Sequence, residues 1–221
     1  MPVPWSASLM FLAVLFTFRA TSTTVNCPTN CTCSDTCTDV DAACSSLSVN
    51  CHGLPGVDRD EFTEQLEWLL SSGLTYSRLE RLEIVNSPLT YLSRSLCRLT
   101  SLRQLHLQNN RLTRLPDNCL GNLTGLTSLY APNNRITKLQ DGVFDGLRKL
   151  IVLNLTDNRI SYIGLRVFNS SSMLTSLRYV GLQNNRLTTL EPWPYFVGVH
   201  ANSSDRATVL LGGNRISAFT N

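Results

Sequence analysis

The chain has 221 residues, of which 43% are hydrophobic and 16% are charged, and its formal net charge at pH 7 is +3. This apolar share supports a packed core and argues against an intrinsically disordered or collagen-like chain. A nearly balanced charge without a basic stripe gives no electrostatic reason to expect nucleic acid as a partner. Leucine is the outlier, since it fills 37 positions, about one residue in six.

Residues 1–22 are typical of a secretory signal peptide. No side chain before Arg19 is charged, and Leu9 to Phe18 is a dense apolar run. The run is shorter than the ~20 apolar residues that a membrane span needs. Small residues at Ala20 and Ser22 fit a cleavage site after Ser22, although the amino end lacks the usual Lys or Arg. We therefore expect an exported protein, and an uncleaved anchor is the alternative.

Six of the eight cysteines lie close together after this segment. They are Cys27, Cys31, Cys33, Cys37, Cys44 and Cys51. In an oxidising compartment an even number of cysteines predicts disulfides, whereas in the cytosol the same cluster would suggest a metal site. Sequence alone does not choose among the possible pairings. Behind the cluster, apolar residues recur at helical spacing within Glu61–Leu70, which predicts a short helix.

The rest of the chain contains an internal repeat. The clearest copy reads Leu102-x-x-Leu105-x-Leu107-x-x-Asn110-x-Leu112-x-x-Leu115. Equivalent asparagines follow in four more copies: Asn134, Asn158, Asn185 and Asn214. A weaker copy begins at Leu79 and has Ser87 in the asparagine position. Successive asparagines are 24, 24, 27 and 29 residues apart, so only the segment between the motifs varies in length.

This motif resembles the leucine-rich repeat, over residues 79–221. The resemblance implies an α/β solenoid of about six coils, with short parallel strands on a concave face. Loops and short helical or 3-10 turns would form the convex face. Each inward leucine would pack on the equivalent leucine of the next coil, so the core is a column that no coil buries alone. The recurrent asparagine is expected to bond backbone groups in the turn, a structural role.

The cysteine cluster resembles the N-terminal cap of extracellular proteins of this family, and we assign the cap to residues 23–78. The resemblance implies these pairings: Cys27 with Cys33, and Cys31 with Cys51 or Cys44. Two extra cysteines depart from the family pattern, and the simplest additional bond joins Cys37 and Cys44.

The remaining cysteines, Cys97 and Cys119, lie at nearly equivalent positions between the motifs of adjacent coils. Neighbouring coils are about 5 Å apart, within reach of a disulfide. We therefore predict a Cys97–Cys119 disulfide, and two buried thiols are the alternative.

The residues between the leucines of each strand predict the binding surface. They would project outward on the concave face, as a mixed polar and aromatic set with few charges, which suits binding to another protein. The candidate partner-binding residues are Arg81, Glu83, Gln104, His106, Gln108, Tyr130, Thr156, Tyr179 and Gln183. For any one of them, a solvated surface without a ligand is the alternative.

An arginine follows the recurrent asparagine in five coils. These arginines are Arg111, Arg135, Arg159, Arg186 and Arg215. A column of like charge would suit an anionic ligand such as a sulfated glycan, although such columns are more often simply solvated.

Five sequons predict N-glycans in an exported chain. They are Asn30, Asn122, Asn154, Asn169 and Asn202. Asn154 differs from the others because it would project from the concave face. A glycan there would shield the centre of the groove and direct protein contact toward the first three coils or a lateral edge.

The sequence predicts a binding protein and not an enzyme. Its three histidines lie in no nucleophile motif, and we find no phosphate loop or metal-ligand spacing, so no catalytic, cofactor or metal residues are assigned. Resemblance to the ectodomains of Toll-type and other leucine-rich repeat receptors implies an extracellular module that binds a protein or glycoconjugate. The alternative is a soluble secreted matrix or inhibitor protein. The repeat stops without a C-terminal cap or a membrane span, so we expect a longer, membrane-tethered form or a secreted one.

Overall fold

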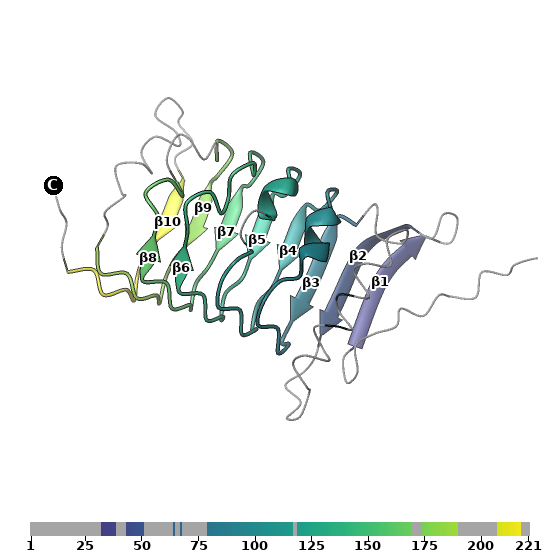
Figure 1. Ribbon diagram of the computed structural model, residues 1–221, viewed down its shortest axis with the longest axis horizontal. Helices are drawn as coiled ribbons and strands as arrows, with labels where there is room; N and C mark the ends of the chain where they lie inside the picture. Colours follow the sequence, from purple (N-terminus) through teal and green to yellow (C-terminus); the bar gives the residue numbers. More distant parts are fainter. Residues whose placement is uncertain are drawn as a thin grey trace, which may run out of the picture.

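The computed structural model describes residues 32–38, 43–50, 64, 67, 79–116, 119–168, 174–189 and 207–217. These residues form a solenoid whose strands follow one another along the long axis of the molecule (Figure 1). The predicted class of fold, a parallel-strand solenoid with little helix, is confirmed.

The main sheet has eight strands in the order β1-β2-β3-β4-β5-β7-β9-β10. Their bounds are β1 (Thr32–Thr38), β2 (Ala43–Asn50), β3 (Arg81–Val85), β4 (Gln104–His106), β5 (Ser128–Tyr130), β7 (Val152–Asn154), β9 (Tyr179–Gly181) and β10 (Thr208–Leu210). β1 and β2 are antiparallel, and every later neighbouring pair is parallel. The six strands from β3 onward correspond to the six copies of the motif, one strand per coil.

The segments between these strands carry little regular structure. Two 3-10 helices, η1 (Arg94–Arg98) and η2 (Leu120–Asn122), lie over one face of the main sheet (Figure 1). Two short strands, β6 (Lys138–Leu139) and β8 (Tyr162–Ile163), form a separate parallel pair. Within the described ranges, no helix is long and apolar enough to cross a membrane.

Aligned leucines form the core. The strand register places Leu82, Leu105, Leu129, Leu153 and Val180 side by side, and all five are completely buried. Burying a side chain of this size contributes about 1.5–3 kcal/mol, but only when the adjacent coil covers it. The fold is therefore stabilised mainly between coils and not within them.

The recurrent asparagines connect each coil to its neighbours. Asn134 is 7% exposed, and its Nδ2 donates to Leu107 O in the preceding coil (2.8 Å) and to Ala131 O in its own coil (3.2 Å). Its Oδ1 accepts from the backbone N of Leu112 (3.0 Å). The equivalent asparagines of the next two coils repeat this arrangement. The predicted structural role of the asparagine is confirmed.

The residue before the asparagine position adopts a left-handed backbone conformation in all six coils. These residues are Asn86 (φ 52°), Asn109 (φ 58°), Asn133 (φ 54°), Asp157 (φ 56°), Asn184 (φ 54°) and Gly213 (φ 72°). Asn and Asp tolerate positive φ better than other side chains with a Cβ. Neighbouring side chains also bond across the coils, since Asn109 Nδ2 donates to Asn86 Oδ1 (2.7 Å) and Asn133 Nδ2 donates to Asn109 Oδ1 (3.0 Å).

The main sheet begins earlier than the repeat predicts. β2 lies within the cysteine cluster and pairs in parallel with β3, so that Leu47 is opposite Leu82. Leu47 and Val49 are completely buried and extend the apolar column into the segment expected to be the cap. The alternation of polar and apolar residues in Ser46–Asn50 is the sequence signal for this strand.

Part of the predicted cap lies outside the described residues. The antiparallel register of β1 and β2 places the backbone of Cys37 opposite that of Cys44, which is compatible with the expected local bond. Cys27, Cys31 and Cys51 fall outside the described ranges, so their pairing stays a prediction. Of the expected helix, residues 64 and 67 are described and both are helical.

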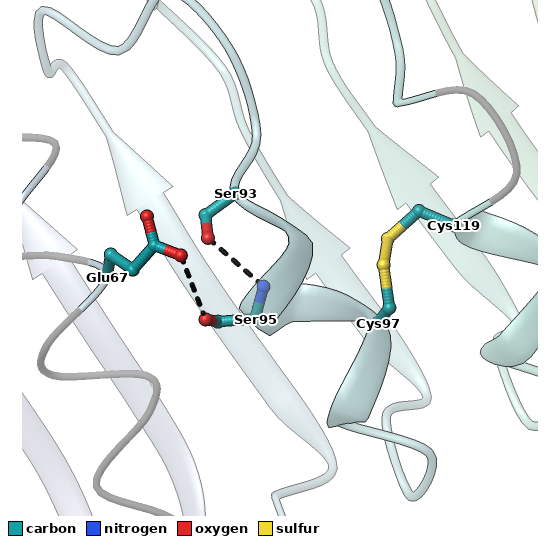
Figure 2. Close-up of a disulfide and its surroundings, with 5 residues drawn as sticks. All are labelled: Glu67, Ser93, Ser95, Cys97 and Cys119. Carbon is teal, nitrogen blue, oxygen red and sulfur yellow. Dashed lines mark hydrogen bonds between the residues drawn. A yellow bond between two sulfur atoms is a disulfide. The ribbon is translucent and has the colours of Figure 1, made fainter.

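The predicted disulfide between Cys97 and Cys119 is present, with the two Cα atoms 5.1 Å apart. It joins η1 to the residue that precedes η2, and so links two adjacent coils (Figure 2). Ser93 caps η1, since its hydroxyl accepts from Ser95 N (3.0 Å). Ser95 Oγ also donates to Glu67 Oε1 (3.3 Å), which connects the helical residue before the repeats to the first coil.

Candidate functional site

The concave face consists of side chains that point away from the column of leucines. Because the strands keep their register, these side chains form rows across the coils. The middle row contains Ser48, Glu83, His106, Tyr130, Asn154, Gly181 and Leu210. The first row contains Ser46, Arg81, Gln104, Ser128, Val152, Tyr179 and Thr208.

All nine candidate partner-binding residues lie in these rows or directly after them, and each is half-buried. Six of the nine lie in the two rows. The other three, Gln108, Thr156 and Gln183, each follow a middle-row residue by two positions. Val85 lies on the same side between Asn50 and Gln108, but it is 9% exposed and is covered by its neighbours. The structure thus gathers the predicted residues on one face.

A polar network occupies the end of the concave face nearest β2. The Arg81 guanidinium donates to the Glu83 carboxylate and to Gln104 Oε1. Ser48 Oγ donates to the other Glu83 oxygen (3.0 Å). Burial raises the pKa of Glu83, but the hydrogen bonds from Arg81 and Ser48 outweigh burial, so its pKa lies below the ordinary value. The carboxylate is therefore ionised at neutral pH and its charge is compensated within the face.

Sequence reasoning missed Ser48 because the cysteine cluster was not expected to contribute a strand to the main sheet. The signal was available in the alternation around Leu47 and Val49, which places Ser48 on the outward side. The concave face therefore includes β2.

Next to this network, the rings of His106 and Tyr130 are stacked with their centroids 4.7 Å apart and an interplanar angle of 23°. Burial lowers the pKa of His106, and the positive charge of Arg81 lowers it further, while Glu83 raises it. The net shift is downward, so the imidazole is neutral at pH 7. The middle of the concave face is thus an uncharged aromatic surface.

Two polar atoms, one in this stack and one close to it in the sequence, have no hydrogen-bond partner among the described residues. His106 Nε2 and Gln108 Oε1 are both buried. A buried unpaired polar group costs about 1–3 kcal/mol. This part of the face therefore gains free energy if a rearrangement on binding supplies the missing hydrogen bonds.

The far half of the concave face is uncharged in both rows, and it combines amide and hydroxyl groups with Val152, Tyr179 and Leu210. Asn154 Oδ1 accepts from Thr156 N (3.1 Å), and Thr156 Oγ1 donates to Gln183 Oε1 (3.0 Å). A Cβ atom at Gly181 would lie only 2.9 Å from Asn154 Oδ1 and 3.0 Å from Thr156 Oγ1. Glycine at position 181 is therefore what allows the Asn154 and Thr156 side chains to lie over β9.

The arginine column lies beside the asparagine turns. Arg111 is half-buried, and the other four arginines are exposed. Their backbone N–H groups donate to the preceding coil, as Arg135 N does to Leu112 O (2.8 Å). Among the described residues no acidic side chain forms an ion pair with the column; the remaining ion pairs, Arg103–Glu80 and Arg166–Asp141, lie elsewhere.

The structure places two of the five sequons. Asn122 is exposed at the end of η2, and Asn154 lies in the middle row of the concave face. Asn30, Asn169 and Asn202 fall outside the described residues. In the part of the chain that is described, no group of three or more His, Cys, Asp and Glu side chains could hold a metal ion.

Comparison with protein families identifies the repeat. The leucine rich repeat family matches residues 77–136 and 125–187, which together make up just over half of the chain. The chain therefore belongs to the leucine-rich repeat family. A comparison with curated proteins found no significant match.

Two solved structures align with parts of this chain. One is a chain of the Toll–Spatzle complex, described as a molecular hub in Drosophila development and innate immunity. It aligns with a TM-score of 0.51 and 27% identity over 62% of this chain and 19% of that chain. A leucine-rich repeat protein of Leptospira interrogans aligns with a TM-score of 0.47 and 23% identity, over 68% of this chain and 40% of that one. This chain thus spans less than half the length of either structure. The leucine-rich repeat family and the likeness to the Toll–Spatzle complex chain indicate a protein-interaction module.

Proposed function

We propose that this chain is an extracellular protein-recognition module, the N-terminal part of the ectodomain of a leucine-rich repeat cell-surface receptor. It binds a protein partner with its concave face. The observation that carries the proposal is the stacked pair of His106 and Tyr130 in the middle row, beside the compensated Arg81–Glu83 pair.

This arrangement has the chemistry of a protein interface. Tyrosine and arginine are enriched among the residues that contribute most to binding, and such residues lie near the centre of an interface. A neutral aromatic pair is easier to desolvate than a charged one. The Arg81–Glu83 pair keeps its internal compensation when a partner excludes water. The face therefore suits a partner protein whose surface is partly apolar and partly able to form hydrogen bonds.

Export is supported by the signal-like residues 1–22 and by the disulfide between Cys97 and Cys119, because disulfides persist mainly in oxidising compartments. The likeness to a chain of the Toll–Spatzle complex supports recognition of a protein. A soluble secreted matrix or inhibitor protein is the alternative form of the same binding module. Detection of the native protein on the cell surface favours the receptor, and its recovery only in the medium favours the soluble form.

The test uses the full chain secreted from cultured cells and a panel of purified extracellular proteins. We expect at least one binder that is lost by the double variant His106→Ala/Tyr130→Ala. The matched control is Tyr91→Ala/Tyr162→Ala, because both tyrosines are exposed (48% and 52%) and lie outside the concave face. Equal binding by the concave-face variant and wild type would exclude this face as the docking site.

A second candidate ligand is an anionic glycan on the arginine column. The observation that favours it is the exposure of the column without an acidic partner among the described residues. We expect the chain to be retained on immobilised heparin, and Arg135→Gln/Arg159→Gln to elute at lower salt, because fewer counterions are then released. Elution of both proteins at the same salt concentration would rule out the column.

A further inference from the structure

Asn154 combines a glycosylation sequon with an unusual position. Asn154, Leu155 and Thr156 form the sequon, and its asparagine ends β7 in the middle row of the concave face. Its Oδ1 is held by Thr156 N (3.1 Å), which orients the carboxamide. Its Nδ2 makes no hydrogen bond to a described residue and is not among the buried unpaired atoms, so the atom to which a glycan is attached is not completely buried.

The row neighbours of Asn154 decide where an attached sugar would lie. Tyr130 occupies the β5 side, where its ring is stacked on His106, and Gly181 occupies the β9 side. The Asn154 carboxamide extends over Gly181, since its Oδ1 lies 2.9 Å from the position that a Cβ would take. A sugar on Nδ2 that extends toward β9 meets no side chain at position 181, whereas one that extends toward β5 meets the side chain of Tyr130.

The two halves of the concave face also differ in the chemistry of their side chains. The half from β2 to β5 carries the ion pair and the stacked rings, which favour a protein partner. The half around β7 and β9 has no charged side chain in either row, and it presents hydroxyl and amide groups, such as Thr156 Oγ1 and Gln183 Oε1, beside Val152 and Tyr179. These groups are compatible with a covering carbohydrate.

From these observations we propose that Asn154 carries an N-linked glycan that covers the β7–β9 half of the concave face and confines protein docking to β2–β5. The inference rests on the proposed function, because glycosylation requires export. The glycan divides the face into a covered half and an open half. The open half contains the stacked pair of His106 and Tyr130.

The first experiment maps glycopeptides of the full chain secreted from cultured cells. We expect occupancy at Asn154 and at the exposed Asn122. Asn154→Gln and Thr156→Val should each lose the mass of one glycan, whereas Thr156→Ser preserves the sequon and should retain it. A bare Asn154 with an occupied Asn122 overturns the inference and leaves export intact. Two bare sequons in a chain that stays inside the cell contradict both the inference and the proposed function.

The second experiment measures the coverage by hydroxyl-radical footprinting of Thr156→Ser and Thr156→Val. Valine has the shape of threonine, and circular dichroism verifies that both variants fold. We expect faster oxidation of Tyr179, in the covered half, when the glycan is lost with Thr156→Val, and no change at His106. Equal oxidation of Tyr179 in the two variants, or an equal increase at His106, would refute the division of the face.

Discussion

Replacing Asn134 with alanine tests whether the buried asparagines hold the coils together. Asn134 Nδ2 donates to the carbonyl oxygens of Leu107, Ala131 and Pro132, but each of these oxygens keeps another donor, from its own coil or an adjacent one. The backbone N–H of Leu112 is different, because its acceptor is Asn134 Oδ1 (3.0 Å) and Leu112 is completely buried. The variant therefore leaves one buried donor unpaired and weakens three acceptors.

The expected cost follows from these two contributions. An unpaired buried N–H costs about 1–3 kcal/mol, and each further hydrogen bond that is lost has a net value of about 1 kcal/mol, reduced here because the oxygens stay partnered. We expect Asn134→Ala to lower the free energy of unfolding by about 2–4 kcal/mol. This is a large share of the stability of an ordinary domain.

Asn110→Ala is the matched control, because the same side chain is truncated one coil earlier. Asn110 Oδ1 is already buried without a hydrogen-bond partner, so Asn110→Ala removes one unpaired acceptor. The variant also takes away the Nδ2 donor of Ile84 O, and the two effects on stability oppose each other. We expect Asn110→Ala to cost less than Asn134→Ala in urea unfolding followed by circular dichroism, with the disulfides intact. A cost for Asn110→Ala equal to or above that of Asn134→Ala would refute this account of the hydrogen bonds.

Three further changes probe other features of the fold. Replacing both Cys97 and Cys119 with alanine opens a link across 22 residues and should cost about 3 kcal/mol, seen as a lower urea midpoint; an unchanged midpoint would contradict this. Because burial and the charge of Arg81 lower the pKa of His106, the unfolded chain binds the proton at a higher pH than the folded one. Stability should therefore fall as the pH drops below about 6.5, and His106→Gln should reduce this dependence; an identical pH profile for the variant would exclude His106 as its source. Asn109→Val places a branched side chain at φ 58° and should lower the stability by about 1–2 kcal/mol relative to Asn109→Gly, which lacks the side-chain bonds as well; equal melting temperatures would exclude backbone strain at this turn.

Local patterns were enough to predict the coil and its stacking. Leucines at fixed intervals must all be buried, and a single coil cannot bury them, so the repeated motif predicts stacked coils in register. The same constancy predicted the Cys97–Cys119 disulfide, because equal positions in adjacent coils are brought within bonding distance. The nine candidate residues followed from alternation along each strand, and the structure places all of them on one face.

The start of the main sheet was harder to predict. β2 does not carry the repeat motif and lies among cysteines, which dominated the interpretation of that segment. Its pairing with β3 depends on residues more than 30 positions away, since Ser46 is opposite Arg81. The resulting contribution of Ser48 to the Glu83 network was therefore outside the reach of a local pattern.

The sequence by itself determined which residues are buried and how successive coils align, because burial repeats with the motif. The tertiary structure decided how the outward side chains use their charges and hydrogen bonds. Arg81 pairs with Glu83 and Gln104, His106 stacks on Tyr130, and the Asn154 carboxamide lies over Gly181. These partners are mostly a whole coil apart in sequence, and interaction between them depends on distances and side-chain directions that only the stacked coils provide.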